Sequence, residues 1–341
     1  MNIYSRGMKI LCLLFLFIMC FSSPSSAKDP VIFSDLDWAS IQLHNRIAGF
    51  IFEHGYGEEV EYLFVDLTPS LMGLERGDVH INMEVWPTYN IEWWDKAQQE
   101  GAVENMGINY EGASQGWYVP TYVIKGDPER GIEPMAPGLR SVFDLPEYWE
   151  VFRDPEDPDH GRLVNGPIGW VAHGINTIKL EGYGLDKYFK PFSPGSGTAL
   201  DTVIVSAYKK GEPVLFYYWE PTWILGRYDM TRLEEPPYDE TLWNSDNKFL
   251  CTWLTATTYV VANREFSESK PRLADMLRRY STSLEQNQKS LAWLEDNGND
   301  MEGGARWFLR NYDKTWKSWI KGQERESVIR RVERALEVQG S

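Results

Sequence analysis

The sequence predicts an α/β fold with two lobes, because strand-like and helix-like segments alternate twice along the 341-residue chain. The first alternating stretch covers 31–86 and the second covers 163–219. Alternation of this kind is typical of parallel sheets that are covered by helices. A strand-like segment at 257–263 then leads to a helical end. The chain therefore crosses twice between the lobes, and we expect a hinged clamp.

Three strands and two helices are expected in the first stretch. Ile41, Ile47 and Phe50 recur at helical spacing and share one helix face. A glycine commonly follows the last residue of a helix, so we expect Gly55 and Gly77 to end the two helices. The expected elements are strands at 31–37, 60–66 and 79–86 and helices at 38–54 and 69–77.

The second lobe is expected to begin after VPTYVI (119–124), which has the composition of an extended crossing segment. After the second crossing the chain is helical over 270–335, with Pro271 near a helix start. The expected elements of the second lobe are strands at 163–169 and 214–219 and helices at about 170–181 and 198–211. The expected parts are lobe 1 at 31–119 and 259–320, lobe 2 at 120–258, and a C-terminal helical tail at 321–341.

The first 27 residues have the three parts of a secretory signal peptide. Arg6 and Lys9 give a basic start, an apolar run covers 10–21, and small residues precede a cleavage site after Ala27. The run is short for a membrane span, which needs roughly 20 residues. We expect an exported, periplasmic protein. Lipid anchoring at Cys20 is not expected, because methionine precedes that cysteine where such sites need a small residue.

The charge and the cysteines narrow the possible partners. A formal net charge of −16 argues against nucleic acid and anionic membranes as partners. Of three cysteines only Cys251 follows the expected cleavage site, so neither an intramolecular disulfide nor a cysteine metal site is expected. The histidines lack zinc-site spacing. No metal and no cofactor are expected.

Four tryptophans stand at the ends of strand-like segments: Trp38, Trp86, Trp170 and Trp219. Ligands of open α/β sheets bind at the carboxyl ends of strands, so indoles from both lobes are expected to converge on one cleft. The face of an indole attracts a cation without N–H donors, such as a quaternary ammonium group. Packing in the hydrophobic core is the alternative that spacing alone leaves open.

Six stretches carry a pattern that is specific only when they are taken together. They are DWASIQLHNRIAGFIFEHGYG (37–57), GDVHINMEVWP (77–87), EGASQGWYVP (111–120), NGPIGWVAHG (165–174), GEPVLFYYWEPTW (211–223) and YVVAN (259–263). With them the chain resembles the glycine betaine/proline betaine substrate-binding proteins of ABC transporters over roughly 31–320. The resemblance implies a two-lobed, type II periplasmic-binding-protein clamp. It also implies a partner, a membrane permease with a cytoplasmic ATPase.

The resemblance also implies which side chains grip the ligand. Members of the family hold a trimethylammonium group between tryptophans, and Trp86, Trp170 and Trp219 match these cage positions. Trp38 matches a cage position of the choline and trimethylamine N-oxide branches. We therefore expect a cage of four indoles.

An anionic end of the ligand would be bound at a helix N-terminus. The resemblance implies that the backbone N–H groups of Val171 and Ala172 hold a carboxylate there. His173 lies beside this turn, and Gln115 belongs to a stretch that can face the cleft. Both are possible ligand contacts.

The identity of the ligand stays open between glycine betaine, choline, trimethylamine N-oxide and dimethylsulfoniopropionate. Some betaine binders have a histidine four residues after the first cage tryptophan, where this chain has Asn90. Glu84 precedes Trp86, and an acidic residue beside a cage suits ligands without a carboxylate. Asn90 and Glu84 are therefore further possible contacts.

Two other patterns suggest different chemistry. Residues 112–116 fit G-x-S-x-G, and a secreted hydrolase that uses Ser114 is the alternative from another class. That motif needs a strand before it and a helix after it. The acidic loop at 153–162 has oxygen ligands for calcium, although a solvated loop is the plainer interpretation.

Overall fold

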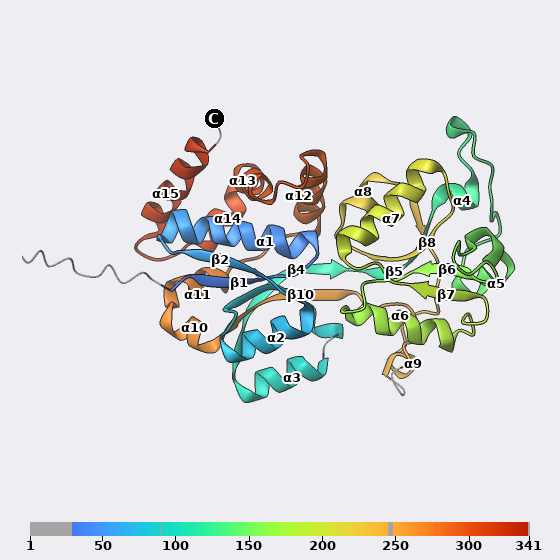
Figure 1. Cartoon of the computed structure of the whole chain (residues 1–341). Coiled ribbons are helices and arrows are strands. Elements are labelled where there is room, and N and C mark those ends of the chain that lie inside the picture. The colour runs from blue at the N-terminus through green and yellow to red at the C-terminus, as the bar shows by residue number, and fades with distance from the viewer. Residues whose placement is uncertain (1–28, 90, 245–247, 340–341) are drawn as a thin grey trace, which may run out of the picture.

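Two five-stranded sheets, each covered by helices, lie side by side in the computed structural model (Figure 1). The structure describes residues 29–89, 91–244 and 248–339. The predicted signal peptide, Cys20 and Asn90 lie outside these residues. The predicted two-lobed α/β fold is confirmed. None of the helices in the described part of the chain is long and apolar enough to span a membrane.

The first sheet has the strand order β2-β1-β3-β10-β4. The strand β1 pairs in parallel with β2 and β3, whereas β10 runs antiparallel between β3 and β4. The return crossing therefore inserts its strand between β3 and the edge strand β4 of the first sheet. The strands are β1 (Val31–Asp35), β2 (Val60–Phe64), β3 (Ile81–Val85), β4 (Val103–Ala113) and β10 (Ala256–Asn263).

The second sheet has the strand order β7-β6-β8-β5-β9. The strand β6 pairs in parallel with β7 and β8, and β5 runs antiparallel to β8. All five residues of β8 are buried, as its aromatic sequence predicts. The strands are β5 (Gln115–Pro120), β6 (Gly161–Val164), β7 (Phe189–Phe192), β8 (Leu215–Trp219) and β9 (Met230–Arg232).

Helices cover both faces of each sheet (Figure 1). The helices of the first lobe are α1 (Ala39–Phe50), α2 (Leu67–Arg76), α3 (Ile91–Glu100), α10 (Arg264–Ser269), α11 (Pro271–Leu277), α12 (Leu284–Asp296), α13 (Met301–Asn311), α14 (Asp313–Trp319) and α15 (Arg325–Val338). Those of the second lobe are α4 (Thr121–Lys125), α5 (Leu145–Tyr148), α6 (Val171–Gly182), α7 (Gly197–Lys210), α8 (Trp223–Arg227) and α9 (Glu240–Asn244). Short 3₁₀ turns occupy Pro87–Tyr89, Pro128–Arg130, Val142–Asp144 and Trp149–Phe152.

The prediction that Gly55 ends the first helix is wrong. The chain stays helical through a π-helical turn at Ile51–Tyr56 and ends at Gly57, whose φ of 71° is left-handed. Gly55 instead allows α15 to pack closely, because a Cβ there would lie 2.9 Å from a methyl group of Val328. The expected end of the second helix at Gly77, with a φ of 82°, is confirmed.

The first crossing differs from the expected one. The strand β4 belongs to the first sheet and β5 to the second, so the chain changes sheets at Ser114. We propose to place the lobe boundary there rather than at residue 119. Residues 121–124, expected to be extended, form most of the helix α4. Because a strand follows Ser114, the strand–turn–helix context of a nucleophile elbow is missing. The Ser114 hydroxyl donates a hydrogen bond to Glu220 Oε2 at 2.7 Å.

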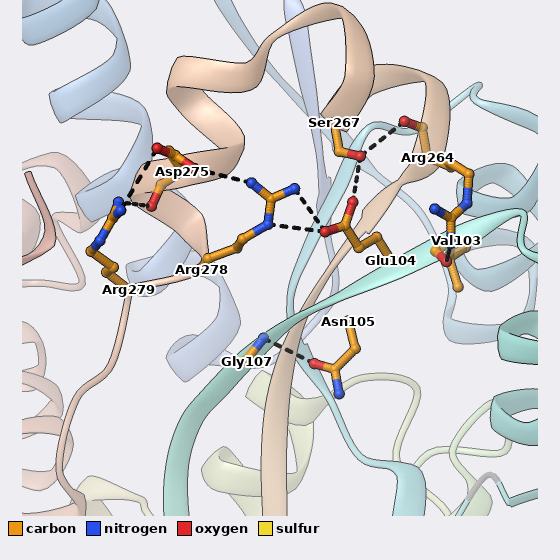
Figure 2. A network of polar contacts seen from close by, with 9 residues as sticks. All are labelled: Val103, Glu104, Asn105, Gly107, Arg264, Ser267, Asp275, Arg278 and Arg279. Carbon is orange, nitrogen blue, oxygen red and sulfur yellow. Dashed lines mark hydrogen bonds and ion pairs between the residues drawn. The ribbon is translucent and has the colours of Figure 1, made fainter. Parts of the chain in front are cut away.

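A polar network fixes the helices after β10 to the edge of the first sheet (Figure 2). Glu104 on β4 accepts hydrogen bonds from Ser267 Oγ on α10 (2.6 Å) and from Arg278 Nη2 (2.7 Å), just after α11. Arg278 also pairs with Asp275 on α11 at 3.1 Å. The returning chain is thereby attached to the same strand that leads to the crossing.

The acidic loop at 153–162 contains an arginine that pairs with one of its carboxylates. Asp154 accepts a hydrogen bond from Arg162 at 2.5 Å, and Asp157 contacts His160 at 2.8 Å. Arg162 thus already neutralises Asp154, the most buried carboxylate of the loop. This ion pair favours the interpretation of the segment as a solvated structural loop.

Candidate functional site

A cavity of about 70 Å³ lies between the two lobes. It is several times larger than the roughly 10–15 Å³ that a single water molecule requires. We call it the tryptophan cavity, and its lining is Trp38, Leu67, Leu71, Asn82, Val85, Trp86, Tyr89, Gln115, Trp170, Val171, Ala172, Tyr217, Trp219 and Trp253. The four tryptophans expected at strand ends therefore meet in one place. Among the described residues, its lining includes no Lys, Arg, Asp or Glu.

Two indoles of the first lobe share one acceptor. Trp38 precedes α1 and Trp86 follows β3, so both stand at the carboxyl ends of strands. Their Nε1–H groups donate to the same oxygen, Glu84 Oε1, at 3.0 and 3.1 Å. The Ser40 hydroxyl donates to that oxygen as well, at 3.0 Å. The carboxylate thereby fixes the orientation of both rings from behind the cavity wall.

Glu84 itself is 1% exposed and does not line the cavity. Burial raises the pKa of this carboxyl to about 7, and the hydrogen bond from Ser40 lowers it in part. Its side chain therefore carries a negative charge only near and above neutral pH. Glu84, expected as a possible ligand contact, therefore lies behind the two indoles and not in the lining of the cavity.

The indoles of the second lobe are held differently. Trp170 is the N-cap residue of α6, and its Nε1–H donates across the cleft to Asp37 Oδ1 at 2.8 Å. The other oxygen of Asp37 accepts from the backbone N–H of Gly197, the first residue of α7, at 3.1 Å. Asp37 belongs to the first lobe, so both contacts join the lobes.

Ring contacts join tryptophans of the two lobes. The centroids of Trp38 and Trp170 are 5.7 Å apart and those of Trp170 and Trp219 are 4.9 Å apart, each pair edge to face. Trp86 stacks on Tyr89 at 6.3 Å. Aromatic faces thus surround the cavity from both lobes.

The helix α6 begins at the cavity. Val171 and Ala172 are its first two residues and line the space beside Trp170. The first N–H groups of an α-helix have no partner within the helix, and the helix dipole adds partial positive charge there. This end of the cavity therefore suits an anionic group.

Of the other residues predicted at the site, some line the tryptophan cavity and some do not. Gln115 lines the cavity, and its Oε1 accepts a hydrogen bond from the Tyr217 hydroxyl. His173 is absent from the lining, and its Nδ1 lies 2.9 Å from the Ser193 hydroxyl. Trp223 lines a neighbouring groove between α1, α7, α8, α12 and α13. Asn90 lies outside the described residues.

Sequence reasoning missed three aromatic residues of the lining. Tyr217 stands two residues before Trp219 on β8, and this spacing puts both on one face of the strand, so the signal was present. Tyr89 ends a short 3₁₀ turn and Trp253 lies outside regular structure, and neither carries such a pattern. They meet with their rings 5.3 Å apart, and the Tyr89 hydroxyl donates to Leu254 O at 2.5 Å.

No group of three His, Cys, Asp or Glu side chains within the described ranges is arranged to hold a metal ion. The cavity has aromatic faces at its sides and backbone donors at one end. This arrangement can bind a small molecule with a bulky cation and a smaller polar end.

Comparison with known proteins agrees with this geometry. Residues 29–311 match a family model described as the substrate-binding domain of the ABC-type glycine betaine transport system. The glycine betaine/proline betaine-binding periplasmic protein of Escherichia coli K12 is 21% identical, over 75% of this chain and 78% of the relative. Its Salmonella typhimurium namesake is 20% identical over the same shares of the two chains.

Solved structures share the fold. The glycine betaine, L-proline-binding protein of Borrelia burgdorferi has a TM-score of 0.70 at 17% identity, covering 88% of this chain and 100% of that one. An ABC-transporter choline-binding protein in complex with choline also has a TM-score of 0.70 at 17% identity, covering 90% and 98%. The architecture is that of a two-lobed periplasmic binding protein. The chain belongs to the family of substrate-binding domains of ABC-type glycine betaine transport systems.

Proposed function

We propose that the protein captures glycine betaine, or a closely related methylated ammonium compound, in the tryptophan cavity. Trp38, Trp86, Trp170 and Trp219 surround the methylated nitrogen. The convergence of these four indoles from both lobes on one cavity without a charged side chain in its described lining carries the proposal.

The aromatic faces suit this group for a physical reason. A fully methylated nitrogen has no N–H donor and is bound by the negative faces of aromatic rings. Each contact contributes about 0.5 kcal/mol when exposed and ~2 kcal/mol when desolvated. Four contacts therefore supply enough for roughly micromolar affinity after ordering costs.

The carboxylate of glycine betaine has a place at the start of α6. The backbone N–H groups of Val171 and Ala172 donate to it, and the side-chain amide of Gln115 lines the same space. Choline, trimethylamine N-oxide and dimethylsulfoniopropionate are the alternative ligands. Choline has a hydroxyl in place of the carboxylate and depends less on α6.

Membership of the family implies that the protein delivers its ligand to a membrane transporter. After closure around the ligand, the two lobes dock on a membrane permease that works with a cytoplasmic ATPase. This role requires export to the periplasm through the signal peptide expected at 1–27. Hinge closure around a ligand is the motion that such two-lobed proteins use.

Calorimetric titration tests the proposal. The mature chain, residues 28–341, is unfolded and refolded to remove carried-over ligand, and is then titrated with glycine betaine, choline, trimethylamine N-oxide, dimethylsulfoniopropionate and unmethylated glycine. Tight binding of a methylated compound without binding of glycine is expected. Binding of glycine as tight as that of glycine betaine, or no binding of any methylated compound, contradicts the proposal.

A further inference from the structure

The buried carboxylate behind the cage has an unequal set of contacts. Glu84 Oε1 accepts three hydrogen bonds, two from cage indoles and one from Ser40. Glu84 Oε2 is buried and lacks a well-formed hydrogen bond among the described residues, although the Tyr110 hydroxyl faces this carboxyl. A carboxylate in this state is costly to ionise, because desolvation disfavours its charge. Scaffolding of two indoles alone does not require a charged group.

The neighbours of Glu84 do not supply a compensating cation. Ser40 faces it from α1, Tyr110 from β4, and Tyr280 from the segment between α11 and α12. His44 of α1 contacts both tyrosines. Burial lowers the pKa of His44 to about 3, so that ring is neutral. Burial raises the pKa of both tyrosines well above the usual value, so they are neutral too.

We propose that Glu84 is a positioning and specificity-determining residue, whose negative charge, passed through the indoles of Trp38 and Trp86, favours ligands that carry a net positive charge. This inference rests on the proposed function. An N–H group that donates to a carboxylate leaves its ring richer in electrons, and an electron-rich ring attracts a cation more strongly.

The same charge distinguishes two ligand types. A cation such as choline gains the full attraction of Glu84. In a zwitterion such as glycine betaine, the carboxylate lies close to the ammonium group and cancels part of that attraction. The start of α6 compensates for this loss in betaine. The end of the cavity near Glu84 therefore favours a cation such as choline, whereas the end at α6 favours a zwitterion such as glycine betaine.

Capture of a cation is then linked to release of a proton. Without ligand the carboxyl titrates near neutral pH. A bound cation favours the ionised form and lowers its pKa. Between the two pKa values binding expels the proton, so affinity for a cation rises as the pH increases through this window and then levels off. At pH 7 roughly half a proton is released per cation bound.

Two measurements test the proposal. Choline and glycine betaine are titrated into wild-type protein and into Glu84→Gln at pH 8, where the variant keeps an acceptor but loses the charge. Wild-type protein is also titrated with choline at pH 7 in two buffers of different ionisation enthalpy, which counts released protons. Asp201→Asn is the matched control, because Asp201 is a buried carboxyl with a raised pKa outside the tryptophan cavity.

We expect Glu84→Gln to lower choline affinity about tenfold and glycine betaine affinity about threefold. The control should leave the ratio of the two affinities unchanged. An equal loss for both ligands, or no proton release from wild-type protein, overturns the inference and leaves the proposed function intact. If Glu84→Gln does not fold, the proton count decides alone. If wild-type protein binds neither choline nor glycine betaine, the inference fails; the proposed function fails as well only if trimethylamine N-oxide and dimethylsulfoniopropionate do not bind either.

Discussion

The two walls of the tryptophan cavity are built in different ways. In the first lobe, Trp38 and Trp86 donate to Glu84, a residue of the same lobe, so their orientation does not depend on the other lobe. In the second lobe, Trp170 donates to Asp37 of the first lobe, so its partner is present only when the lobes meet. The first wall is thus fixed within one lobe, whereas Trp170 of the second wall has its partner only when the lobes meet. If the proposed function holds, ligand binding and lobe closure can therefore be tested through different residues.

The largest expected effect is the pH dependence of the unfolding free energy, which the buried carboxyl of Glu84 in the first wall causes. The folded-state pKa of Glu84 is about 7, above its ordinary value of 4.5, so its contribution to stability is complete below about pH 4.5 and is lost as pH rises through 7. The loss amounts to roughly 3 kcal/mol of unfolding free energy between pH 4.5 and 8. Urea denaturation of wild-type protein and Glu84→Gln across this range measures it.

The variant should lose less stability on going to pH 8 than wild-type protein does. Asp201, whose pKa burial raises to about 6, acts in the same direction and remains in the variant, so some dependence should persist. Parallel stability profiles for the two proteins would show that Glu84 is not the titrating group.

The next effect tests whether the second wall contributes to affinity. Trp219→Ala should weaken binding of glycine betaine at least tenfold, since a desolvated cation–π contact is worth ~2 kcal/mol. Trp223→Ala is a matched control, because the two side chains are 7% and 8% exposed but only Trp219 lines the cavity. Calorimetry should show a large loss for the first variant and a small one for the second. Equal losses of affinity in the two variants would mean that the substitutions act by destabilising the second lobe and not by removing a ligand contact.

A smaller effect separates the anionic end from the cage. Val171→Pro removes one backbone donor at the first position of α6, where proline is tolerated. Trp170 has φ −89° and ψ 143°, which a residue before proline can adopt. We expect about a fivefold loss for glycine betaine, from one charge-assisted hydrogen bond that is partly replaced, and little change for choline. Val171→Ala keeps the donor and serves as the control; an equal loss for both ligands in the proline variant would contradict this assignment.

The smallest expected effect concerns closure. Asp37→Asn leaves one acceptor for two interlobe donors, and the site is partly exposed, so we expect a loss of about threefold in affinity. Small-angle scattering should show a less compact protein at subsaturating ligand. Asp78→Asn changes a surface carboxylate that pairs only within the first lobe and should have no effect. An unchanged affinity in Asp37→Asn would mean that these contacts do not stabilise the closed form.

The convergence of the four tryptophans on one cavity was predictable because its signals are local. Each of the four tryptophans stands where a strand ends, and the edge of a sheet brings such positions together. Asp37 was not predictable as the partner of Trp170, because the two meet only after both lobes have folded and approached. Tyr89 reaches the cavity from a three-residue 3₁₀ turn and Trp253 from a segment without regular structure, and no periodicity marks either one.

At the first crossing, local composition predicted the wrong secondary structure. Residues 119–124 contain strand-forming residues, yet most of them form α4, because tertiary contacts override propensity. The carbonyl of Val123 accepts backbone hydrogen bonds from Met135 (2.9 Å) and Ala136 (2.8 Å), a loop that cannot be read from 119–124 alone. At Ser114 a single residue separates two strands that belong to different sheets.

The most direct test of the central claim is a crystal structure of the refolded protein with glycine betaine bound. The account predicts the methylated nitrogen in the tryptophan cavity, within about 6 Å of the ring centroids of the four indoles, with the carboxylate at the start of α6. A ligand in the neighbouring groove beside Asp201, or one whose carboxylate faces Trp38 and Trp86, would contradict it.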